Sequence, residues 1–185
     1  MATSSRRSHH PLQHLISAPF NRPEVLEKLR PAFAAAGSIV LPRACDPASF
    51  RPPRMRSFDL ANRGRYELAE LPAQPALRQF AEALTGRRVV PAWVRLQRFR
   101  RGGYSLFYDD AVTRLETGVE LTLDLSRSVA GAPAVYSSGL IIPQAPGIVA
   151  AVVRTPEIFR YDRYLPASVG RAQVLRLRAA FTFAD

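Results

Sequence analysis

Residues 174–183 read VLRLRAAFTF, and the alternation in this stretch decides the fold. One row of side chains is apolar (positions 175, 177, 179, 181 and 183), and the opposite row carries Arg176 and Arg178. A period of two is that of a β-strand whose two faces have different surroundings. VELTLDLS at 119–126 repeats the pattern, with leucines opposite Glu120, Thr122 and Asp124. Both stretches are therefore predicted to be strands.

Further short β runs fill the chain between Val94 and Phe183, with proline or glycine breaks about every ten residues. They include GGYSLFYDD at 102–110 and PGIVAAVV at 146–153. Many short alternating runs separated by turn residues are typical of an antiparallel sandwich or barrel. The second half of the chain should therefore form two facing sheets.

Helical patterns precede the strands, over residues 23–36 and 75–85. Asn21 is suited to cap the first helix and Gly37 to end it, while Pro31 should kink or split it. Residues 38–41 read as a short buried strand, and the proline-rich stretch 42–65 as an irregular covering loop. The predicted class is α+β, mainly β, with a double-stranded β-helix (jelly-roll or cupin-like) core and N-terminal helices packed on one sheet.

The 185 residues are enough for one domain with a sizeable core. We expect a flexible N-terminal arm over residues 1–17 and a single domain over 18–185. No apolar run is long enough to span a bilayer, and no apolar stretch follows the early arginines as in a secretory signal. Cys45 is the only cysteine, so an internal disulfide is excluded. These features predict a cytoplasmic protein.

The net charge of +11 allows two interpretations. Lys28 is the only lysine among the 26 basic residues, a bias typical of a GC-rich bacterial genome. A basic chain can also bind nucleic acid. Here the arginines are scattered, with their densest cluster over residues 95–101 on a predicted strand rather than on a basic helix. An arginine-rich solvated surface is the favoured interpretation, and nucleic-acid binding is the alternative.

The order of elements and several motifs resemble the 2-oxoglutarate- and Fe(II)-dependent oxygenases, in particular the prolyl-hydroxylase-like branch. In that family a strand reading Gly-Tyr-x-x-x-His-x-Asp supplies two iron ligands, and a Pro-x-x-Gly turn precedes a buried strand. A distal histidine follows, and an arginine on the last strand holds the cosubstrate's carboxylate. Here Gly103-Tyr104 opens the first motif, and Pro143 to Gly147 resembles the turn. The resemblance covers the chain from about residue 15.

The iron ligands are where the chain departs from the family. The motif places Tyr108 and Asp110 at the two ligand positions, or Phe107 and Asp109 after a slip of one residue. The distal ligand should fall within 160–164, which reads RYDRY. The histidines stand at positions 9, 10 and 14, far from these motifs. Fe(II) in this family is coordinated by two neutral nitrogens and a carboxylate. Since the motif positions here hold no histidine, the usual oxidative cycle is not expected.

The resemblance implies that Arg176 or Arg178 anchors a carboxylate ligand. If the apolar row of their strand packs on the helices, both arginines point into the barrel, where a buried charge needs an anionic partner. The alternative is an internal salt bridge to Asp110, Asp124 or Asp162. A rim for ligand contact is expected from the following residues: Tyr104, Arg160, Tyr161 and Tyr164. Their mixture of cations and aromatic rings suits stacking, or a loop closed by its own ion pairs.

Three hypotheses follow. The leading one is a degenerate oxygenase-like domain, a pseudoenzyme that binds a protein or a small anionic ligand through its remnant pocket or arginine-rich rim, with no tightly bound cofactor. The second is an oxygenase with an atypical metal site at Tyr108 and Asp110, which would require Fe(II) and 2-oxoglutarate. The third is a nucleic-acid-binding protein. None of the three involves a membrane.

Overall fold

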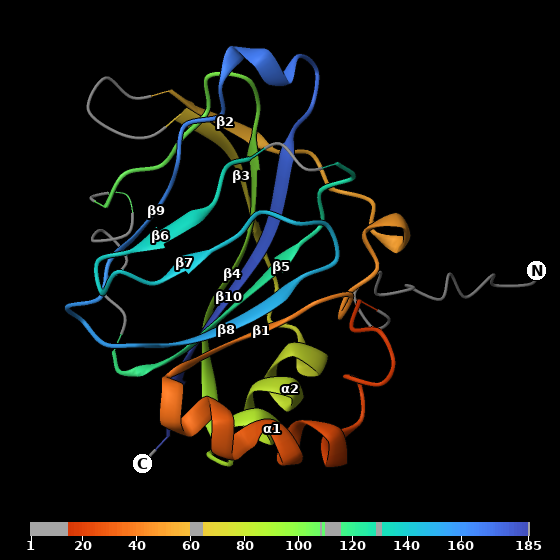
Figure 1. Cartoon of the computed structure of the whole chain (residues 1–185), viewed down its shortest axis with the longest axis vertical. Coiled ribbons are helices and arrows are strands. Elements are labelled where there is room, and N and C mark those ends of the chain that lie inside the picture. The colour runs from red at the N-terminus through yellow and green to blue at the C-terminus, as the bar shows by residue number, and fades with distance from the viewer. Residues whose placement is uncertain (1–14, 60–64, 108, 110–115, 129–130, 185) are drawn as a thin grey trace, which may run out of the picture.

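The computed structural model describes residues 15–59, 65–107, 109, 116–128 and 131–184. A large and a small antiparallel sheet lie one in front of the other, with the helices below them in Figure 1. The helical elements are α1 (Pro23–Ala36), α2 (Pro75–Thr85) and the short 3-10 helices η1 (Pro47–Ser49) and η2 (Ala167–Val169). The large sheet runs, in spatial order, β1 (Ser38–Leu41), β8 (Val149–Arg154), β5 (Gly118–Asp124), β10 (Val174–Phe183), β4 (Val89–Phe99), β3 (Arg65–Leu71) and β2 (Arg56–Asp59). The small sheet runs β7 (Ile141–Ile142), β6 (Ala134–Tyr136) and β9 (Arg160–Asp162).

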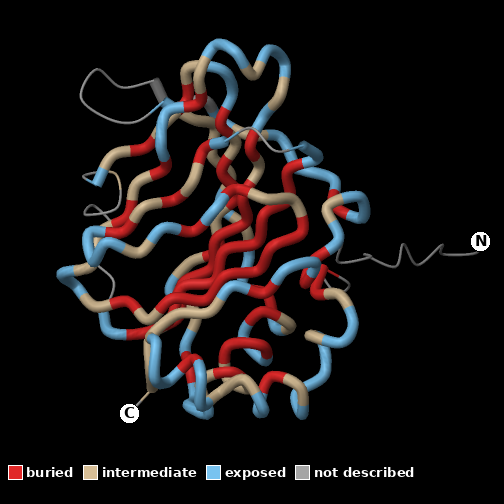
Figure 2. Tube along the Cα trace, in the orientation of Figure 1, coloured by how far each residue is buried: buried red, intermediate tan, exposed pale blue. Residues whose placement is uncertain are grey.

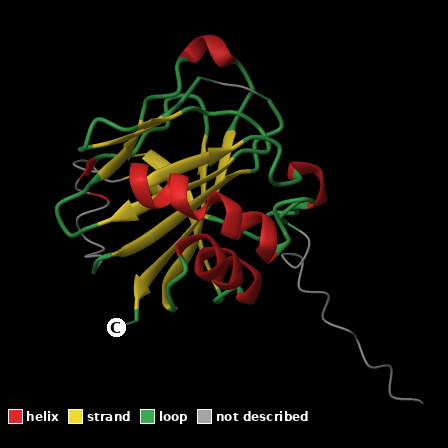
Figure 3. Cartoon of the chain, turned by 60° about the horizontal axis from the view of Figure 1, so that its bottom comes forward, coloured by secondary structure: helices red, strands yellow, loops and turns green. Residues whose placement is uncertain are grey.

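This architecture confirms the α+β, mainly β prediction. The segments 119–126 and 174–183 lie in β5 and β10, which pair with each other near the middle of the large sheet. Both helices pack on one face of that sheet, as Figure 3 shows. The small sheet covers the opposite face, where Ala134 and Tyr136 pack against Ala150 and Val152. The two faces of the large sheet are therefore in different environments.

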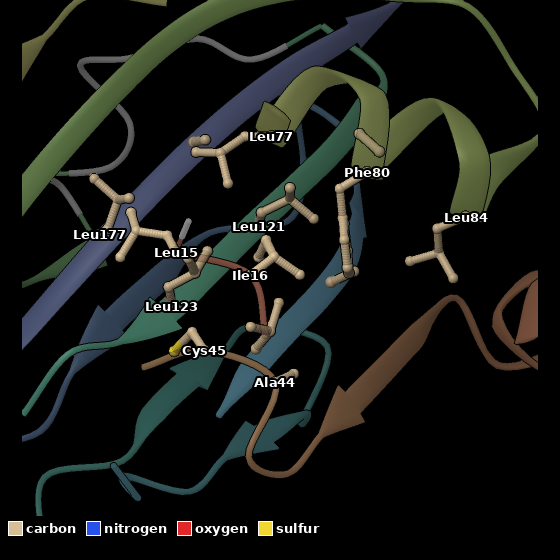
Figure 4. Packing of buried hydrophobic residues seen from close by; sticks show 14 of the residues in the cluster. Leu15, Ile16, Ala44, Cys45, Leu77, Phe80, Leu84, Leu121, Leu123 and Leu177 are labelled. Atoms are coloured by element: carbon tan, nitrogen blue, oxygen red, sulfur yellow. The ribbon is translucent and has the colours of Figure 1, made fainter. Parts of the chain in front are cut away.

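The core on the helix side explains the apolar row of each central strand. Leu77 and Phe80 of α2 lie beside Leu121 of β5 in Figure 4, and Leu84 and Leu123 belong to the same core. Every residue of β5 is buried, and Figure 2 shows that burial is concentrated in these central strands. Leucines at every second position therefore belong to the helix-side core, and the polar residues between them are directed to the small sheet.

The ends of α1 differ in part from the prediction. The helix ends at Gly37 as expected, where φ is 66° and the N–H donates to the Phe33 carbonyl at 2.8 Å. Its N-cap is Arg22 rather than Asn21, because the residue before Pro23 is driven into the extended conformation that an N-cap adopts. Pro31 neither ends nor splits the helix, which continues through it to Ala36. Helix–helix packing outweighs the one hydrogen bond that proline cannot donate.

The prediction of an irregular loop over 42–65 was wrong at its C-terminal end. β2 occupies Arg56–Asp59, and the following strand, β3, begins at Arg65. β3 pairs with β4, and β2 pairs with β3, so the two extend the large sheet at one edge. Edge strands are only half-buried, which weakens the hydrophobic alternation that identifies strands in a sequence.

The run at 102–110 was predicted as a strand, but its described residues form only an isolated bridge and irregular structure up to Leu106, and Phe107 and Asp109 are helical. Tyr104 forms an isolated bridge with Arg65, and the Ser105 N–H donates to the Asp162 carbonyl at 3.0 Å. Asp109 closes a turn, because its carboxylate accepts the Leu106 N–H at 2.8 Å. Aspartate favours such local turns over a regular ladder.

The chain already belongs to the folded domain at Leu15, three residues before the expected boundary at 18. Leu15 and Ile16 are buried in the helix-side core, and Ile16 bridges to Cys45. The Cys45 thiol lies 3.6 Å from the Ile148 carbonyl oxygen, and burial raises its pKa to about 12. Leu15 and Ile16 thus pack in the core beside Cys45.

Neither α1 nor α2, the helices of the described ranges, is long and apolar enough to cross a membrane.

Candidate functional site

The space between the two sheets is lined by charged side chains. β5 contributes Glu120 and Asp124, because they alternate with the leucines that face the helices. The adjacent strand β10 contributes Arg176, opposite Asp124, and Arg178, opposite Thr122. The apolar row of β10 does pack on the helix side, so both arginines point between the sheets as the alternation predicted.

Glu120 is the centre of this network and is fully buried. Its carboxylate accepts hydrogen bonds from three arginines that belong to three different strands. Arg178 donates at 2.8 and 3.0 Å, Arg160 donates at 2.6 Å, and Arg154 forms a third ion pair. The Tyr136 hydroxyl lies 3.2 Å from the same carboxylate. One acid therefore joins β5, β8, β9 and β10.

Asp162 is the second acidic centre, and it is supplied by the small sheet. Arg160 donates to its carboxylate at 3.0 Å, and Arg176 forms a second ion pair with it. The Ser105 hydroxyl donates to the other carboxylate oxygen at 3.1 Å and accepts the Asp162 N–H at 2.7 Å. Arg176 also donates to the Ala132 carbonyl. Asp162 thus holds the segment after Gly103 against β9 and β10.

The two acids remain ionised because of these arginines. Burial alone would raise the pKa of Glu120, but Arg178, Arg154 and Arg160 outweigh it and hold the pKa below its usual range. Burial also opposes ionisation of Asp162, yet Arg160 and Arg176 lower its pKa to about 2. The buried charged residues of the described chain are four arginines and three carboxylates: Arg154, Arg160, Arg176, Arg178, Glu120, Asp124 and Asp162. These residues form an ionic cluster between the two sheets.

Little room remains beside this cluster. A cavity of about 20 Å³ is bordered by Tyr66, Gln97, Asp109, Arg160 and Arg178, among others. A single water needs about 10–15 Å³, whereas pockets for small organic ligands measure roughly 300–1,000 Å³. The side chains of the network therefore fill the space between the sheets.

Comparison with protein-family models gives no match, and comparison with curated protein sequences gives none either. Solved structures do match. A prolyl hydroxylase from Trichoplax adhaerens, in complex with a peptide fragment of hypoxia inducible factor, superimposes with a TM-score of 0.62 at 9% identity, over 86% of this chain and 90% of that one. An oxidoreductase of the 2OG-Fe(II) oxygenase family from Burkholderia pseudomallei gives 0.59 at 12% identity, over 87% and 91%. A prolyl-4-hydroxylase from Pseudomonas putida gives 0.56 at 11% identity, over 86% and 100%.

The chain has the fold of the 2OG-Fe(II) oxygenases. The resemblance drawn from Gly103-Tyr104 and the final strand is thereby confirmed at the level of fold. The double-stranded β-helix arrangement of the two sheets is confirmed with it, since these oxygenases cover most of both chains.

The described residues do not fit the iron of the oxygenase fold. No group of three or more His, Cys, Asp or Glu side chains in this part of the chain is arranged to hold a metal ion. The distal ligand was expected within 160–164, where the inward-facing side chains are Arg160 and Asp162. A guanidinium donates hydrogen bonds and cannot ligate a cation, and Asp162 is already ion-paired with two arginines. Tyr108 and Asp110, the other expected ligands, lie outside the described residues.

The two arginines expected to anchor 2-oxoglutarate both have carboxylate partners within the chain. Arg176 is engaged by Asp162, which is the internal salt bridge that the sequence left open as an alternative. Arg178 is engaged by Glu120, which was not among the partners considered. Glu120 and Arg154 are the residues that sequence reasoning missed. Glu120 shares the inward row of β5 with Asp124, and that shared face was the available signal.

The expected rim is only partly found. Arg160 was predicted on the rim and is 1% exposed, because its strand turns this side chain between the sheets. Tyr161 points the other way and packs edge-on against Phe107, with ring centroids 4.6 Å apart. Tyr104 and Tyr164 form a second ring pair at 6.5 Å, and Tyr164 is 56% exposed. The aromatic residues of the predicted rim thus lie in two neighbouring pairs outside the ionic cluster.

Proposed function

We propose that this protein is a non-catalytic binding or accessory protein built on the oxygenase fold. The observation that carries the proposal is the ion-pair network around Glu120 and Asp162. Arg160 joins both acids, while Arg176 and Arg178 each pair with one of them. In this arrangement each arginine proposed as a cosubstrate anchor has an internal carboxylate partner.

No tightly bound cofactor is part of this proposal. The named partners of the solved neighbours, Fe(II) and 2-oxoglutarate among them, belong to the competing hypothesis of an oxygenase with an atypical metal site. That site would need metal ligands other than the buried acids, because Glu120 is already ion-paired with three arginines and Asp162 with two.

The binding surface in this proposal is the outer rim, and its ligand is a protein or a small anion. The pairs Phe107–Tyr161 and Tyr104–Tyr164 present aromatic edges beside basic residues of the same segment. Aromatic side chains with arginines nearby are enriched where proteins contact partners. The chain has one cysteine, Cys45, and so no disulfide framework of the kind that small secreted domains use, and we include the cytoplasm in the proposal as its compartment.

A combined metal and turnover assay tests the proposal. Protein purified without added metal should contain well under one iron per chain. When Fe(II), ascorbate and 2-oxoglutarate are supplied, succinate should not exceed the level of a protein-free control. Stoichiometric iron, or succinate production that Asp110→Ala abolishes while the variant stays folded, would establish the oxygenase hypothesis instead.

A further inference from the structure

A groove of about 310 Å³ lies on the outer face of the large sheet, at the end where β5 finishes and β10 begins. Its apolar floor includes Phe50, Leu125 and Leu175, which belong to the helix-side core or pack against it. The groove is therefore separated from the ionic cluster by the sheet itself. Its volume is at the lower end of the range of small-molecule pockets.

Three arginines line this groove. Arg98 projects from β4, Arg127 follows the end of β5, and Arg171 precedes β10. The backbone joins the last two segments, because the Leu125 N–H donates to the Leu175 carbonyl at 2.8 Å. Residues far apart in the sequence are thus held around one depression by the pairing of two central strands.

Arg98 is the fixed member of the three. Its Nε donates to the Glu67 carboxylate at 2.9 Å, and its Nη2 forms a second bond to the same group. The Arg98 side chain is only 20% exposed. Glu67 therefore orients this guanidinium on the sheet surface before any ligand arrives.

Arg127 and Arg171 differ from Arg98 in lacking such a partner. Both are exposed, and neither forms an ion pair with a described carboxylate. No acidic residue stands among the described residues that line the groove. Other arginine-lined depressions of the described surface do include an acid, Glu67 in one and Glu70 in another. Arg127 and Arg171 are thus two positive charges at one hollow without a described acidic partner, and a bound anion would compensate them.

We propose that this groove binds an organic phosphate, with the phosphate group against Arg98, Arg127 and Arg171 and the organic part over the apolar floor. Arginine binds phosphate oxygens through directed, charge-assisted hydrogen bonds. Ser128 and Gln173 add uncharged hydrogen-bonding groups to the same wall. The site is independent of the proposed function, because it lies on the opposite face of the sheet from Glu120.

Two sources share this chemistry: a free nucleotide and the phosphate backbone of a nucleic acid. Arg98 also lines the adjacent depression that contains Arg65, Arg100 and Arg101, so a longer ligand has a basic path beyond the groove. The experiment must therefore compare a mononucleotide with a short single strand.

Titration calorimetry on the full chain at about 50 mM salt tests the site, since phosphate contacts weaken as salt rises. The probes are AMP, adenosine and a single-stranded oligonucleotide. We expect AMP to bind, adenosine not to bind, and R127Q/R171Q to weaken AMP binding at least tenfold. The control is R54Q/R56Q, which removes the same charge from a different depression and should change the affinity less than twofold.

The outcomes separate the sources and can overturn the proposal. If only the oligonucleotide binds, and R127Q/R171Q alone weakens it, the phosphate of a nucleic acid is the ligand. Equal losses in both double variants would mean general attraction to a basic protein and would refute a site. Absence of binding by AMP and by the oligonucleotide would refute it as well. Circular dichroism spectra of both variants should match that of the wild type, since all four substituted side chains are exposed.

Discussion

Arg160 on the small sheet donates to Glu120 on the large sheet at 2.6 Å, and both side chains are completely buried. The two residues are 40 positions apart in the chain. The same guanidinium reaches Thr122 at 2.8 Å and Asp162 at 3.0 Å. The contact between the sheets is therefore ionic at its centre and apolar at its side, where Tyr136 packs with Ala150 and Val152. Glu120 and Arg160 fix how the two sheets sit against each other.

Replacing Glu120 by glutamine should destabilise the protein strongly. The change leaves Arg154, Arg160 and Arg178 without their common carboxylate, and breaking a buried ion pair on one side costs about 3–5 kcal/mol. Urea unfolding at neutral pH measures the free energy of unfolding. The control is Glu70→Gln, whose partner is Arg95 at the surface and whose loss should cost about 1 kcal/mol or less. A loss at Glu120 no larger than the control would contradict the central role of this acid.

Acid should unfold the protein in a window set by Asp162. Its pKa falls from 3.8 to about 2 on folding, so below pH 4 the unfolded chain binds the proton first. The contribution of Asp162 to the free energy of unfolding, about 2–3 kcal/mol, is therefore present above about pH 4. It is lost as the pH falls towards 2. Glu120, whose pKa is also lowered, acts in the same direction. Denaturant titrations at several pH values measure the slope, which Asp162→Asn should reduce. A stability that stays level down to pH 2 would be inconsistent with ionised buried acids.

Arg176→Leu separates an internal ion pair from a working anion pocket. The substitution removes the ion pair to Asp162 and the bond to the Ala132 carbonyl, so we expect a loss of about 1–3 kcal/mol. Arg160 still serves Asp162, which limits the loss. Millimolar 2-oxoglutarate should shift the melting temperature of neither protein. Arg101→Leu, at an exposed position, is the matched control and should melt like the wild type. A shift with 2-oxoglutarate that Arg176→Leu alone removes would show a functioning pocket.

Gly118→Ala should disrupt the centre of the large sheet. A Cβ at this position would lie 1.9 Å from the Phe181 carbonyl oxygen of β10, and a backbone atom cannot move aside as a side chain can. Pairing between β5 and β10 would have to shift, so we expect a large loss of melting temperature or failure to fold. Gly37→Ala is the control: nothing lies within 4 Å of its added Cβ, and its positive φ costs about 1 kcal/mol. Equal melting temperatures for the two variants would contradict this close approach.

The fold was predictable where side chains alternate strongly. β5 and β10 lie between an apolar and an ionic layer, so their two rows of residues differ in chemistry, and α2 shows its apolar stripe clearly. β3 was not predicted as a strand, because it lies near the sheet edge and both of its faces are half-buried. The segment after Gly103 was misread because apolar and aromatic residues there pack as a turn around Asp109.

The site was predictable in part. The alternation of β10 placed Arg176 and Arg178 between the sheets. The need of a buried charge for a partner indicated Asp110, Asp124 or Asp162, of which Asp162 pairs with Arg176. Which acid pairs with which arginine depends on the order of the strands in the sheet. That order places β5 beside β10, although the two strands are far apart in the sequence. Glu120 and Arg154 could not be paired from a sequence in which 34 positions separate them.

Because the single thiol is buried, its reaction with a labelling reagent can report local opening of the native protein. Cys45 is 4% exposed, and Ile16 bridges to it from the N-terminal segment. A thiol-specific alkylating reagent can react only when that segment and the sheet edge separate, because reaction needs an exposed thiolate. The labelling rate under native conditions therefore measures local opening, and its dependence on urea separates fraying of the segment from global unfolding. No residue has to be introduced for that measurement.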